Sequence, residues 1–116
     1  MKLTNQREEI INYLQRTRNH PDAKEVFSKV KKKLPRISLG TIYRNLDFLA
    51  KENRIEKINM ENYGKYDGNS EIHDHLICTV CNNIEDIPKL KLNLKNFEAK
   101  KVNVFGLCEK CMEELK

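Results

Sequence analysis

Residues 73–81 read His-Asp-His-Leu-Ile-Cys-Thr-Val-Cys, and this stretch combines two patterns that are typical of metal binding. Side chains alternate between the two faces of a β-strand, so His73 and His75 are expected on one face and Asp74 on the other. Two imidazoles on one face are a natural pair of metal ligands. Asp74 points away from them and is expected to be exposed to solvent. A Cys-x-x-Cys pair follows the histidines directly.

The cysteines predict a structural zinc site in the C-terminal half. A second Cys-x-x-Cys pair lies near the end of the chain, and all four cysteines follow residue 77. Two such pairs chelate tetrahedral Zn²⁺ through thiolates, and a site closed by four ligands keeps no open position for chemistry. A redox or iron–sulfur centre is the alternative use of four cysteines. The expected ligands of structural Zn²⁺ are Cys78, Cys81, Cys108 and Cys111.

Length and charge favour two small modules, the first of which binds a polyanion. Residues 1–60 carry 14 Lys and Arg against 7 Asp and Glu, a net charge of +7, whereas residues 61–116 carry 8 against 10, a net charge of −2. A basic module indicates nucleic-acid binding, although a lysine-rich surface can also serve solubility alone. No apolar run reaches the ~18 residues of a membrane span, and the first residues contain no signal-peptide core. We therefore expect a cytoplasmic protein without a membrane partner.

Helical periodicity in the basic half predicts three short helices followed by a β-hairpin. Asp22 is expected to cap the second helix, which runs to about residues 34–35, and Ser38 to cap the third. Residues 54–60 and 65–67 flank a turn and predict the two strands of the hairpin. The apolar faces of the first and third helices are expected to contain Leu3, Ile10, Ile11, Leu14, Ile42, Leu46 and Leu49.

Three helices and a hairpin with a basic surface make a winged helix-turn-helix the most economical architecture, in which the third helix enters the major groove of DNA. Arginine and asparagine can read base edges, and tyrosine can contact a thymine methyl or a phosphate. Ser38 and Gly40 lie in the first turn, where a small residue permits close backbone approach. A three-helix packing unit without a DNA role is the alternative. The exposed, DNA-reading face is expected to present Thr41, Tyr43, Arg44 and Asn45.

The acidic half is expected to contain short strands around the cysteine pairs. A Lys- and Leu-rich segment, residues 89–100, lies between the last two strands, and its leucines at positions 90, 92 and 94 alternate with polar residues. We assign that segment to no element. The predicted strands and the closing helical turn are residues 76–80, 83–87, 101–105 and 109–115.

A second metal site with nitrogen and oxygen ligands is predicted around the two histidines. Asp67 lies six residues before His73, and Asp86 lies five residues after Cys81. The one remaining histidine, His20, precedes a proline, a position where histidine is usually a surface or capping residue. An ion that also captured His20 would tie the basic module to the acidic one and could set the position of a DNA-binding helix. These ligand types suit Fe²⁺, Mn²⁺, Co²⁺ or Zn²⁺.

Taken together, three motifs resemble those of the ferric uptake regulator family. They are Ser-Leu-Gly-Thr-Ile-Tyr-Arg-Asn-Leu at residues 38–46, His-x-His-Leu-Ile-Cys-x-x-Cys at 73–81 and Gly-Leu-Cys-x-x-Cys at 106–111, and the resemblance covers nearly the whole chain. It implies a metal-dependent transcriptional repressor, not an enzyme, that binds a pseudo-palindromic operator in double-stranded DNA as a homodimer. The implied fold is α+β, with an N-terminal winged helix-turn-helix (1–68) and a small C-terminal α/β dimerisation domain with a four-cysteine zinc site (69–116).

The resemblance also implies a regulatory Fe²⁺ or Mn²⁺, with Zn²⁺ possible, held by His20, Asp67, His73, His75 and Asp86. At the last of these positions the peroxide-sensing branch carries Asp, as here, and the iron-sensing branch typically carries Glu. The chain is therefore most similar to the peroxide sensor, in which iron-catalysed oxidation modifies ligand histidines, here His20 and His73. An iron or zinc homeostasis regulator on the same scaffold is the alternative. More distant alternatives are a non-haem iron oxygenase and a structural zinc-ribbon adaptor. The short spacing between Asp86 and Cys108 predicts a trimmed helix in the dimerisation domain.

Overall fold

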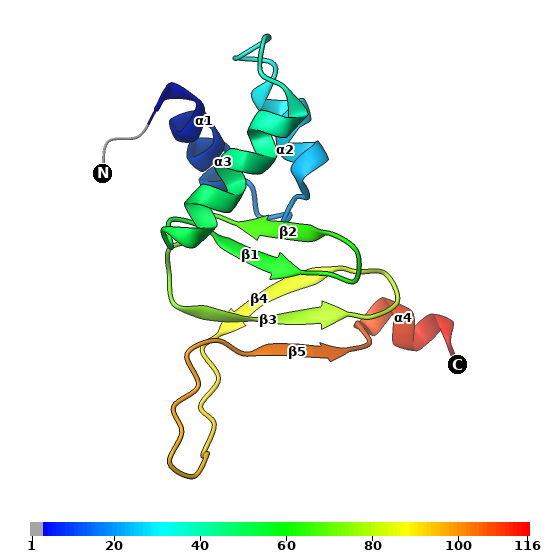
Figure 1. Cartoon of the computed structure of the whole chain (residues 1–116). Helices are drawn as coiled ribbons and strands as arrows, with labels where there is room; N and C mark the ends of the chain where they lie inside the picture. Colours follow the sequence, from blue (N-terminus) through cyan, green and yellow to red (C-terminus); the bar gives the residue numbers. More distant parts are fainter. Residues whose placement is uncertain (1–3) are drawn as a thin grey trace. The chain divides into compact units, whose positions relative to one another are not determined.

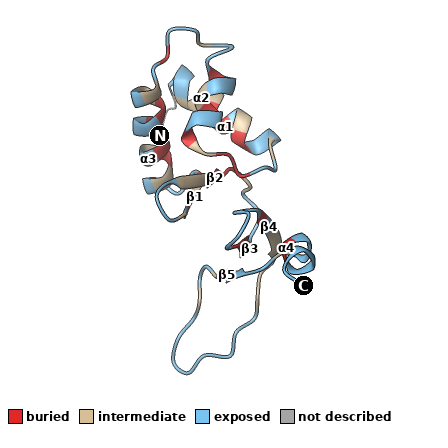
Figure 2. Cartoon of the chain, turned by 90° about the vertical axis from the view of Figure 1, so that its right-hand side faces the viewer, coloured by how far each residue is buried: buried red, intermediate tan, exposed pale blue. Residues whose placement is uncertain are grey.

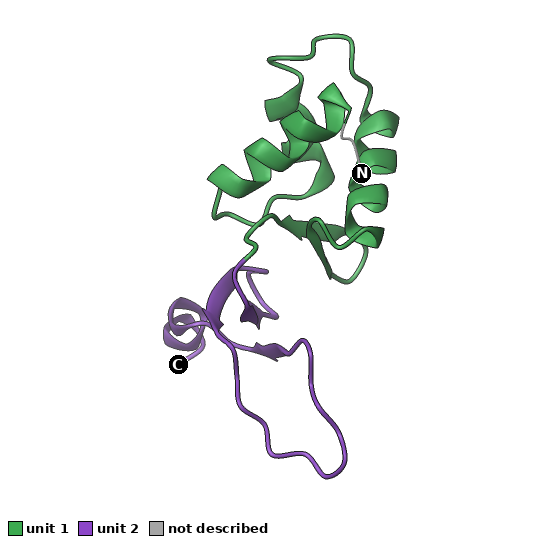
Figure 3. Ribbon diagram, turned by 90° about the vertical axis from the view of Figure 1, so that its left-hand side faces the viewer, with its two compact units in different colours: residues 1–70 green, residues 71–116 purple. Residues whose placement is uncertain are grey.

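The computed structural model describes residues 4–116, so Leu3, expected in the first helix, lies outside the described residues. The chain divides into two compact units, residues 1–70 (unit 1) and residues 71–116 (unit 2), which Figure 3 shows in separate colours. Both helices and strands occur, which confirms the expected mixed α+β class. None of the helices in residues 4–116 has the length and apolar character needed to cross a membrane.

Unit 1 contains the three expected helices and the expected hairpin (Figure 1). Each helix begins at a side-chain cap: Thr4, Asp22 and Ser38 each accept a hydrogen bond from the backbone N–H three residues later. The second helix ends before residues 34–35, because the N–H groups of Lys32 and Lys33 bond to carbonyls three residues back and tighten the last turn. The elements are α1 (Asn5–Arg16), α2 (Ala23–Val30), α3 (Leu39–Lys51), β1 (Glu56–Asn59) and β2 (Gly64–Asp67).

The helices of unit 1 bury one apolar core, to which β2 contributes Tyr66. The expected core positions among the described residues are confirmed, and each fully buried aliphatic side chain contributes about 1.5–3 kcal/mol. Gly68, just after β2, packs against α1 so closely that a Cβ there would lie 2.7 Å from the carbonyl carbon of Leu14. No larger residue fits without a backbone shift. The buried aliphatic side chains of the three helices are Ile10, Ile11, Leu14, Ala23, Val26, Val30, Ile42, Leu46 and Leu49.

Unit 2 is a three-stranded sheet with the order β4-β3-β5, followed by a short helix. The central strand runs antiparallel to β4 and parallel to β5. It begins at His73, earlier than the predicted start at residue 76, so both His73 and His75 belong to it. The other strands lie within a few residues of the predicted ranges. The bounds are β3 (His73–Cys78), β4 (Ile84–Pro88), β5 (Asn103–Gly106) and α4 (Glu109–Glu114).

A long segment without helix or strand connects β4 to β5. We call residues 89–101 the arm. In Figure 1 the arm leads away from the edge of the sheet and returns to it, and Figure 2 shows it to be almost entirely exposed. The only regular feature along it is a turn at residues 95–96. The crossover therefore contains no helix at all, as its short length suggested.

Candidate metal centres and nucleic-acid interface

The four cysteines of unit 2 converge on one point. Their sulfur atoms all lie within 4.8 Å of one another, and the sulfurs of Cys81 and Cys108 are 3.8 Å apart. Cys78 ends β3 and Cys111 lies in α4, so the two Cys-x-x-Cys pairs come from opposite ends of the sequence of unit 2. Asn82 adopts a left-handed conformation with a φ of 62° and closes the turn of the first Cys-x-x-Cys pair by donating its N–H to the Cys78 carbonyl at 3.0 Å. Four thiols at these distances form a tetrahedral zinc-type donor set.

The thiols differ in their acidity. Hydrogen bonds from the backbone N–H groups of Cys81 and Cys108 lower the pKa of Cys78 to about 6. Hydrogen bonding to Cys108, together with burial, raises the pKa of Cys111 to about 12. Sulfur atoms this close cannot all be anionic unless a cation lies among them, because like charges raise one another's pKa. The donor set therefore fits a divalent soft-ligand ion and offers no isolated reactive thiolate.

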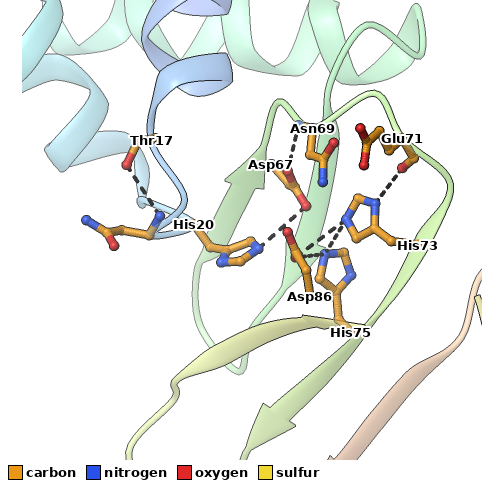
Figure 4. A network of polar contacts seen from close by, with 9 residues as sticks. Thr17, His20, Asp67, Asn69, Glu71, His73, His75 and Asp86 are labelled. Carbon is orange, nitrogen blue, oxygen red and sulfur yellow. Dashed lines mark hydrogen bonds and ion pairs between the residues drawn. The ribbon is translucent and has the colours of Figure 1, made fainter. Parts of the chain in front are cut away.

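A second group of metal-type donors lies in unit 2 on the neighbouring strands β3 and β4. Asp86 on β4 is the direct register partner of His75 on β3, which places its carboxylate beside both histidines. The Oδ1 atom of Asp86 lies 3.2 Å from Nε2 of His75 and 3.5 Å from Nε2 of His73, and the two Nε2 atoms are 3.1 Å apart (Figure 4). The expectation that the histidines share one strand face is confirmed.

The hydrogen bonding of His73 indicates what this trio can hold. Its Nδ1 lies 2.6 Å from the carbonyl oxygen of Glu71, which can only accept, so Nδ1 carries the proton. Nε2 of neutral His73 then presents a lone pair toward the carboxylate of Asp86 and the second imidazole. Two lone pairs and an anion converge favourably only around a cation or a proton. The carbonyl contact is also the usual way in which a metal-bound histidine is oriented.

Unit 1 contributes a separate pair of donors, His20 and Asp67. The segment before α2 is joined to β2 because the Tyr66 N–H donates to the Pro21 carbonyl, which brings His20 beside Asp67. Nε2 of His20 lies 3.5 Å from Oδ2 of Asp67, and both side chains are buried (Figure 4). Oδ1 of Asp67 accepts the N–H of Asn69 at 2.7 Å. The five predicted ligands thus form two sets, one in each unit.

The backbone at His20 is strained. Its φ is 50°, in the left-handed region that residues with a Cβ rarely adopt. Such a conformation costs roughly 1–3 kcal/mol and persists where the surrounding structure or a function requires it. A histidine held in this way beside a buried carboxylate is not the ordinary surface residue that its position before a proline indicates.

The expectation that Asp74 is exposed is wrong. Its side chain is 1% exposed, and its carboxylate accepts the backbone N–H groups of Leu90 at 2.8 Å and Val102 at 2.9 Å. Lys89 adds an ion pair at 3.1 Å. Burial alone would raise the pKa of Asp74, but these hydrogen bonds outweigh it and hold the pKa below its ordinary value. Asp74 is on the face opposite the histidines, as alternation requires, but the two ends of the arm cover its carboxylate there.

Of the residues predicted to contact DNA, all except Asn45 are at least partly exposed to solvent. Tyr43 and Arg44 are exposed, and the Arg44 guanidinium donates to Thr41 Oγ1 at 3.0 Å, which orients it along the helix. Ser38 caps the helix, its Oγ lying 2.9 Å from Thr41 Oγ1. A Cβ at Gly40 would meet only ordinary contacts within this chain.

Asn45 faces the inside of unit 1, so the expectation that it is exposed is wrong. Its side chain accepts a hydrogen bond from Arg7 Nε at 3.1 Å and donates to Gln6 Oε1 at 3.3 Å. The Arg7 guanidinium also lies 3.7 Å from the centre of the Phe48 ring. Asn45 therefore joins α3 to α1. The signal was in the sequence, because residues 42, 45, 46 and 49 follow the spacing of a buried helical stripe.

A groove lies between α3 and the hairpin of unit 1, with a volume of about 640 Å³. Sequence reasoning did not anticipate it, since it depends on how the hairpin packs beside the helix. Its polar lining combines two lysines with two aspartates, and Lys57 forms an ion pair with Asp47 at 3.9 Å. Three tyrosines add hydroxyl groups that can donate hydrogen bonds to a phosphate. The charged and tyrosine residues on its walls are Asp22, Lys24, Tyr43, Asp47, Lys57, Tyr63 and Tyr66.

Comparison of the whole sequence with known protein families and relatives agrees with these features. The ferric uptake regulator family model matches residues 1–113. The chain belongs to the ferric uptake regulator family. The peroxide-responsive repressor PerR of Staphylococcus epidermidis is 28% identical over 125 residues, which cover 98% of this chain and 83% of PerR.

Solved structures of family members share the fold. The Helicobacter pylori ferric uptake regulator Fur, which has three functional metal-binding sites, superposes with a TM-score of 0.78 at 26% identity, covering 97% of this chain and 83% of that one. The Campylobacter jejuni peroxide stress regulator gives a TM-score of 0.72 at 30% identity, covering 91% of this chain and 88% of that one. The resemblance and the fold class, with a winged helix-turn-helix and a C-terminal domain containing the four cysteines, are confirmed.

Proposed function

We propose that this member of the ferric uptake regulator family is a metal-dependent transcriptional repressor that binds operator DNA as a homodimer. The observation that carries the proposal is the convergence of His73, His75 and Asp86 in unit 2, whose geometry favours a cation among them. A second observation is that the cysteine cluster is a complete four-ligand set by itself. The chain then has two metal sites, of which the cysteine site stabilises unit 2 and the other regulates.

The regulatory ion would be shared between the two ligand sets. His20 and Asp67 of unit 1 supply one imidazole and one carboxylate, and unit 2 supplies two imidazoles and one carboxylate. An ion bound by both sets favours the arrangement of the units in which all five donors reach it. Because α3 belongs to unit 1, metal occupancy would fix the DNA-reading helix relative to the dimerisation domain. Metal and operator binding are then coupled thermodynamically, each strengthening the other.

Imidazole and carboxylate ligands suit Fe²⁺ and Mn²⁺, and the Asp at position 86 favours the peroxide-sensing branch. Bound Fe²⁺ would supply the chemistry that reduces peroxide, whereas Mn²⁺ would not. We propose that the resulting oxidation modifies His20 or His73 and so removes an imidazole ligand. The cysteines play no part in sensing, because all four belong to the structural zinc site.

On the DNA side, α3 would lie in the major groove with Arg44 and Tyr43 directed to it. Arginine binds guanine through two hydrogen bonds, and the contact with Thr41 now holds the Arg44 guanidinium along the first turn of α3. Lys57, on β1, would contact the phosphate backbone from the groove beside α3. Asn45 would act only through helix packing. In a homodimer two copies of α3 would read a pseudo-palindromic operator.

A regulator of iron or zinc homeostasis is the second candidate. It is supported by the likeness to the H. pylori ferric uptake regulator, which shares the fold with a TM-score of 0.78 at 26% identity. The two candidates share the ligands and the DNA interface. They differ in whether peroxide modifies the iron-loaded protein.

The test of metal dependence uses duplexes that the Mn²⁺-loaded protein selects from a random-sequence library. Fluorescence anisotropy then measures binding with and without Mn²⁺. His73→Ala and Asp86→Ala are expected to reduce the metal-dependent gain in affinity by on the order of 10–100-fold while the zinc content stays unchanged. Glu114→Ala, which removes an exposed carboxylate of the same unit outside the arm, is the matched control and should behave as the parent. Undiminished metal dependence in both ligand variants would refute the regulatory site.

A further inference from the structure

The arm exposes apolar side chains that neither metal site nor the DNA interface explains. Leu92 is 49% exposed, Leu94 is 43% exposed and Phe97 is 69% exposed. Residues 90–94 alternate leucine with polar residues, which in an extended chain places the leucines on one side. Figure 2 shows no other part of unit 2 packed over this segment. An apolar row of this kind normally marks an interaction surface.

The arm is anchored at its base and is not a freely moving loop. Asp74 accepts the backbone N–H of Leu90 at one end and of Val102 at the other. The Asp74 carboxylate is buried, and each of its two oxygen atoms accepts a hydrogen bond from one end of the arm. The chain must therefore leave and re-enter the sheet at fixed points. The leucine row is therefore presented from a defined position, which lowers the entropy lost when a partner binds it.

One face of the same sheet has a matching apolar surface. Leu76 on β3 is the register partner of Glu85 on β4 and of Val104 on β5, so these three side chains form a row across the sheet. Leu76 is 38% exposed and Val104 is 40% exposed. Together with Leu107 they line a hollow of about 160 Å³. Asp74 lies on this face too, two residues before Leu76, so the arm starts from the face that it matches.

The charges of the arm and of its surroundings are complementary. The arm contains five lysines and one glutamate, a net charge of +4, whereas the rest of residues 71–116 contains two lysines and seven acidic residues, a net charge of −5. Glu85 puts one of those negative charges directly beside Leu76. Lysines alternate with the leucines of the arm, so the arm has an apolar side and a basic side. An apolar surface with an acidic border is complementary to both.

We propose that the arm of one protomer docks on the Leu76–Val104 face of a second copy of this chain, with Lys91 and Lys95 near the partner's Glu85. Each copy offers one arm and one face, so a reciprocal exchange closes a twofold dimer without leaving either surface uncovered. Nucleic acid would satisfy the lysines but leave Leu92, Leu94 and Phe97 exposed. The proposal specifies the surface by which the homodimer of the proposed function assembles, and it rests on that dimer.

The closing experiment measures dimerisation of the zinc-loaded full-length chain by sedimentation velocity, without DNA and without a regulatory metal. Its outcome therefore does not depend on whether the chain senses peroxide. The variant K91E/K95E and the variant E85K are each expected to weaken the dimer by roughly tenfold or more, because each faces like charge across the interface. An equimolar mixture of the two should recover parental affinity as a heterodimer, since both of its arm contacts again join opposite charges.

The mixture separates exchange between chains from an arm folded on its own sheet. In the folded-back case each variant keeps its own like-charge contact, so mixing restores nothing and the proposal is overturned. The apolar part is tested by L92N/L94N, which should weaken the dimer at least tenfold, against Leu115→Asn, which removes a more exposed leucine outside the arm. Equal losses in these two would also overturn it. A fall in affinity for non-specific duplex DNA in K91E/K95E, with dimerisation unchanged, would identify nucleic acid as the partner instead.

Discussion

Replacing the buried carboxylate of Asp74 is expected to destabilise unit 2 strongly. Asp74→Ala leaves the backbone N–H groups of Leu90 and Val102 without their acceptor, at sites where hydrogen bonds of 2.8 and 2.9 Å now satisfy them. A hydrogen bond to a charged group is worth about 1.5–3 kcal/mol. Lys89, whose side chain is 29% exposed, can turn to water and adds little. The expected loss from the two bonds together is about 3–6 kcal/mol, a large part of the stability of a small domain.

The loss can be measured by urea unfolding of the zinc-loaded protein, followed by hydrogen exchange of individual amides. Asp74→Ala should shift the transition of unit 2 to lower urea and release the amides of Leu90 and Val102 to rapid exchange. Glu98→Gln is the control, because its carboxylate is 81% exposed and pairs only with Lys100 among the contacts of the described chain, so a change within about 0.5 kcal/mol is expected. A shift for Asp74→Ala no larger than the control, with both amides still protected, would refute the role assigned to this carboxylate.

Three further predictions concern the two units. Gly68→Ala should destabilise unit 1 by about 1–3 kcal/mol in thermal unfolding, because its Cβ would lie 2.7 Å from Leu14, whereas Gly106→Ala, with nothing within 4 Å, should cost no packing energy. Asn45→Ala should lower stability by about 1–2 kcal/mol by removing both hydrogen bonds to α1, and equal urea midpoints for parent and variant would contradict this. Cys111→Ser should reduce the zinc content and unfold unit 2 while unit 1 keeps its helical circular dichroism, so retained zinc would contradict a four-cysteine site.

The sequence predicted those elements that local rules determine. Asp22 and Ser38 cap α2 and α3 because each precedes an apolar helical stripe with a free N–H three residues on. The hairpin follows from its alternating strands and central turn. The cysteine cluster follows from chelation alone, because two Cys-x-x-Cys pairs supply the four ligands of one tetrahedral ion regardless of the structure of the chain between them.

Features that depend on distant partners were not predictable in this way. Asp74 was placed on the correct strand face, but the groups that bury it are Leu90 and Val102, 16 and 28 residues away, at the base of a segment with no assigned structure. The expectation for Asn45 fails for a different reason. Its residue type suggested DNA readout, although its spacing from Ile42 already placed it in the buried stripe of α3. In a helix of this kind, position on the stripe decides burial before residue type does.

The most direct test of peroxide sensing is mass spectrometry of the Fe²⁺-loaded protein after one equivalent of hydrogen peroxide, with the Mn²⁺-loaded protein treated in parallel. The proposal predicts one added oxygen on His20 or His73 in the iron form only, together with loss of binding to the selected duplex. If the iron form stays unmodified while metal still switches DNA binding on, peroxide sensing is contradicted and the chain is a metal-homeostasis regulator.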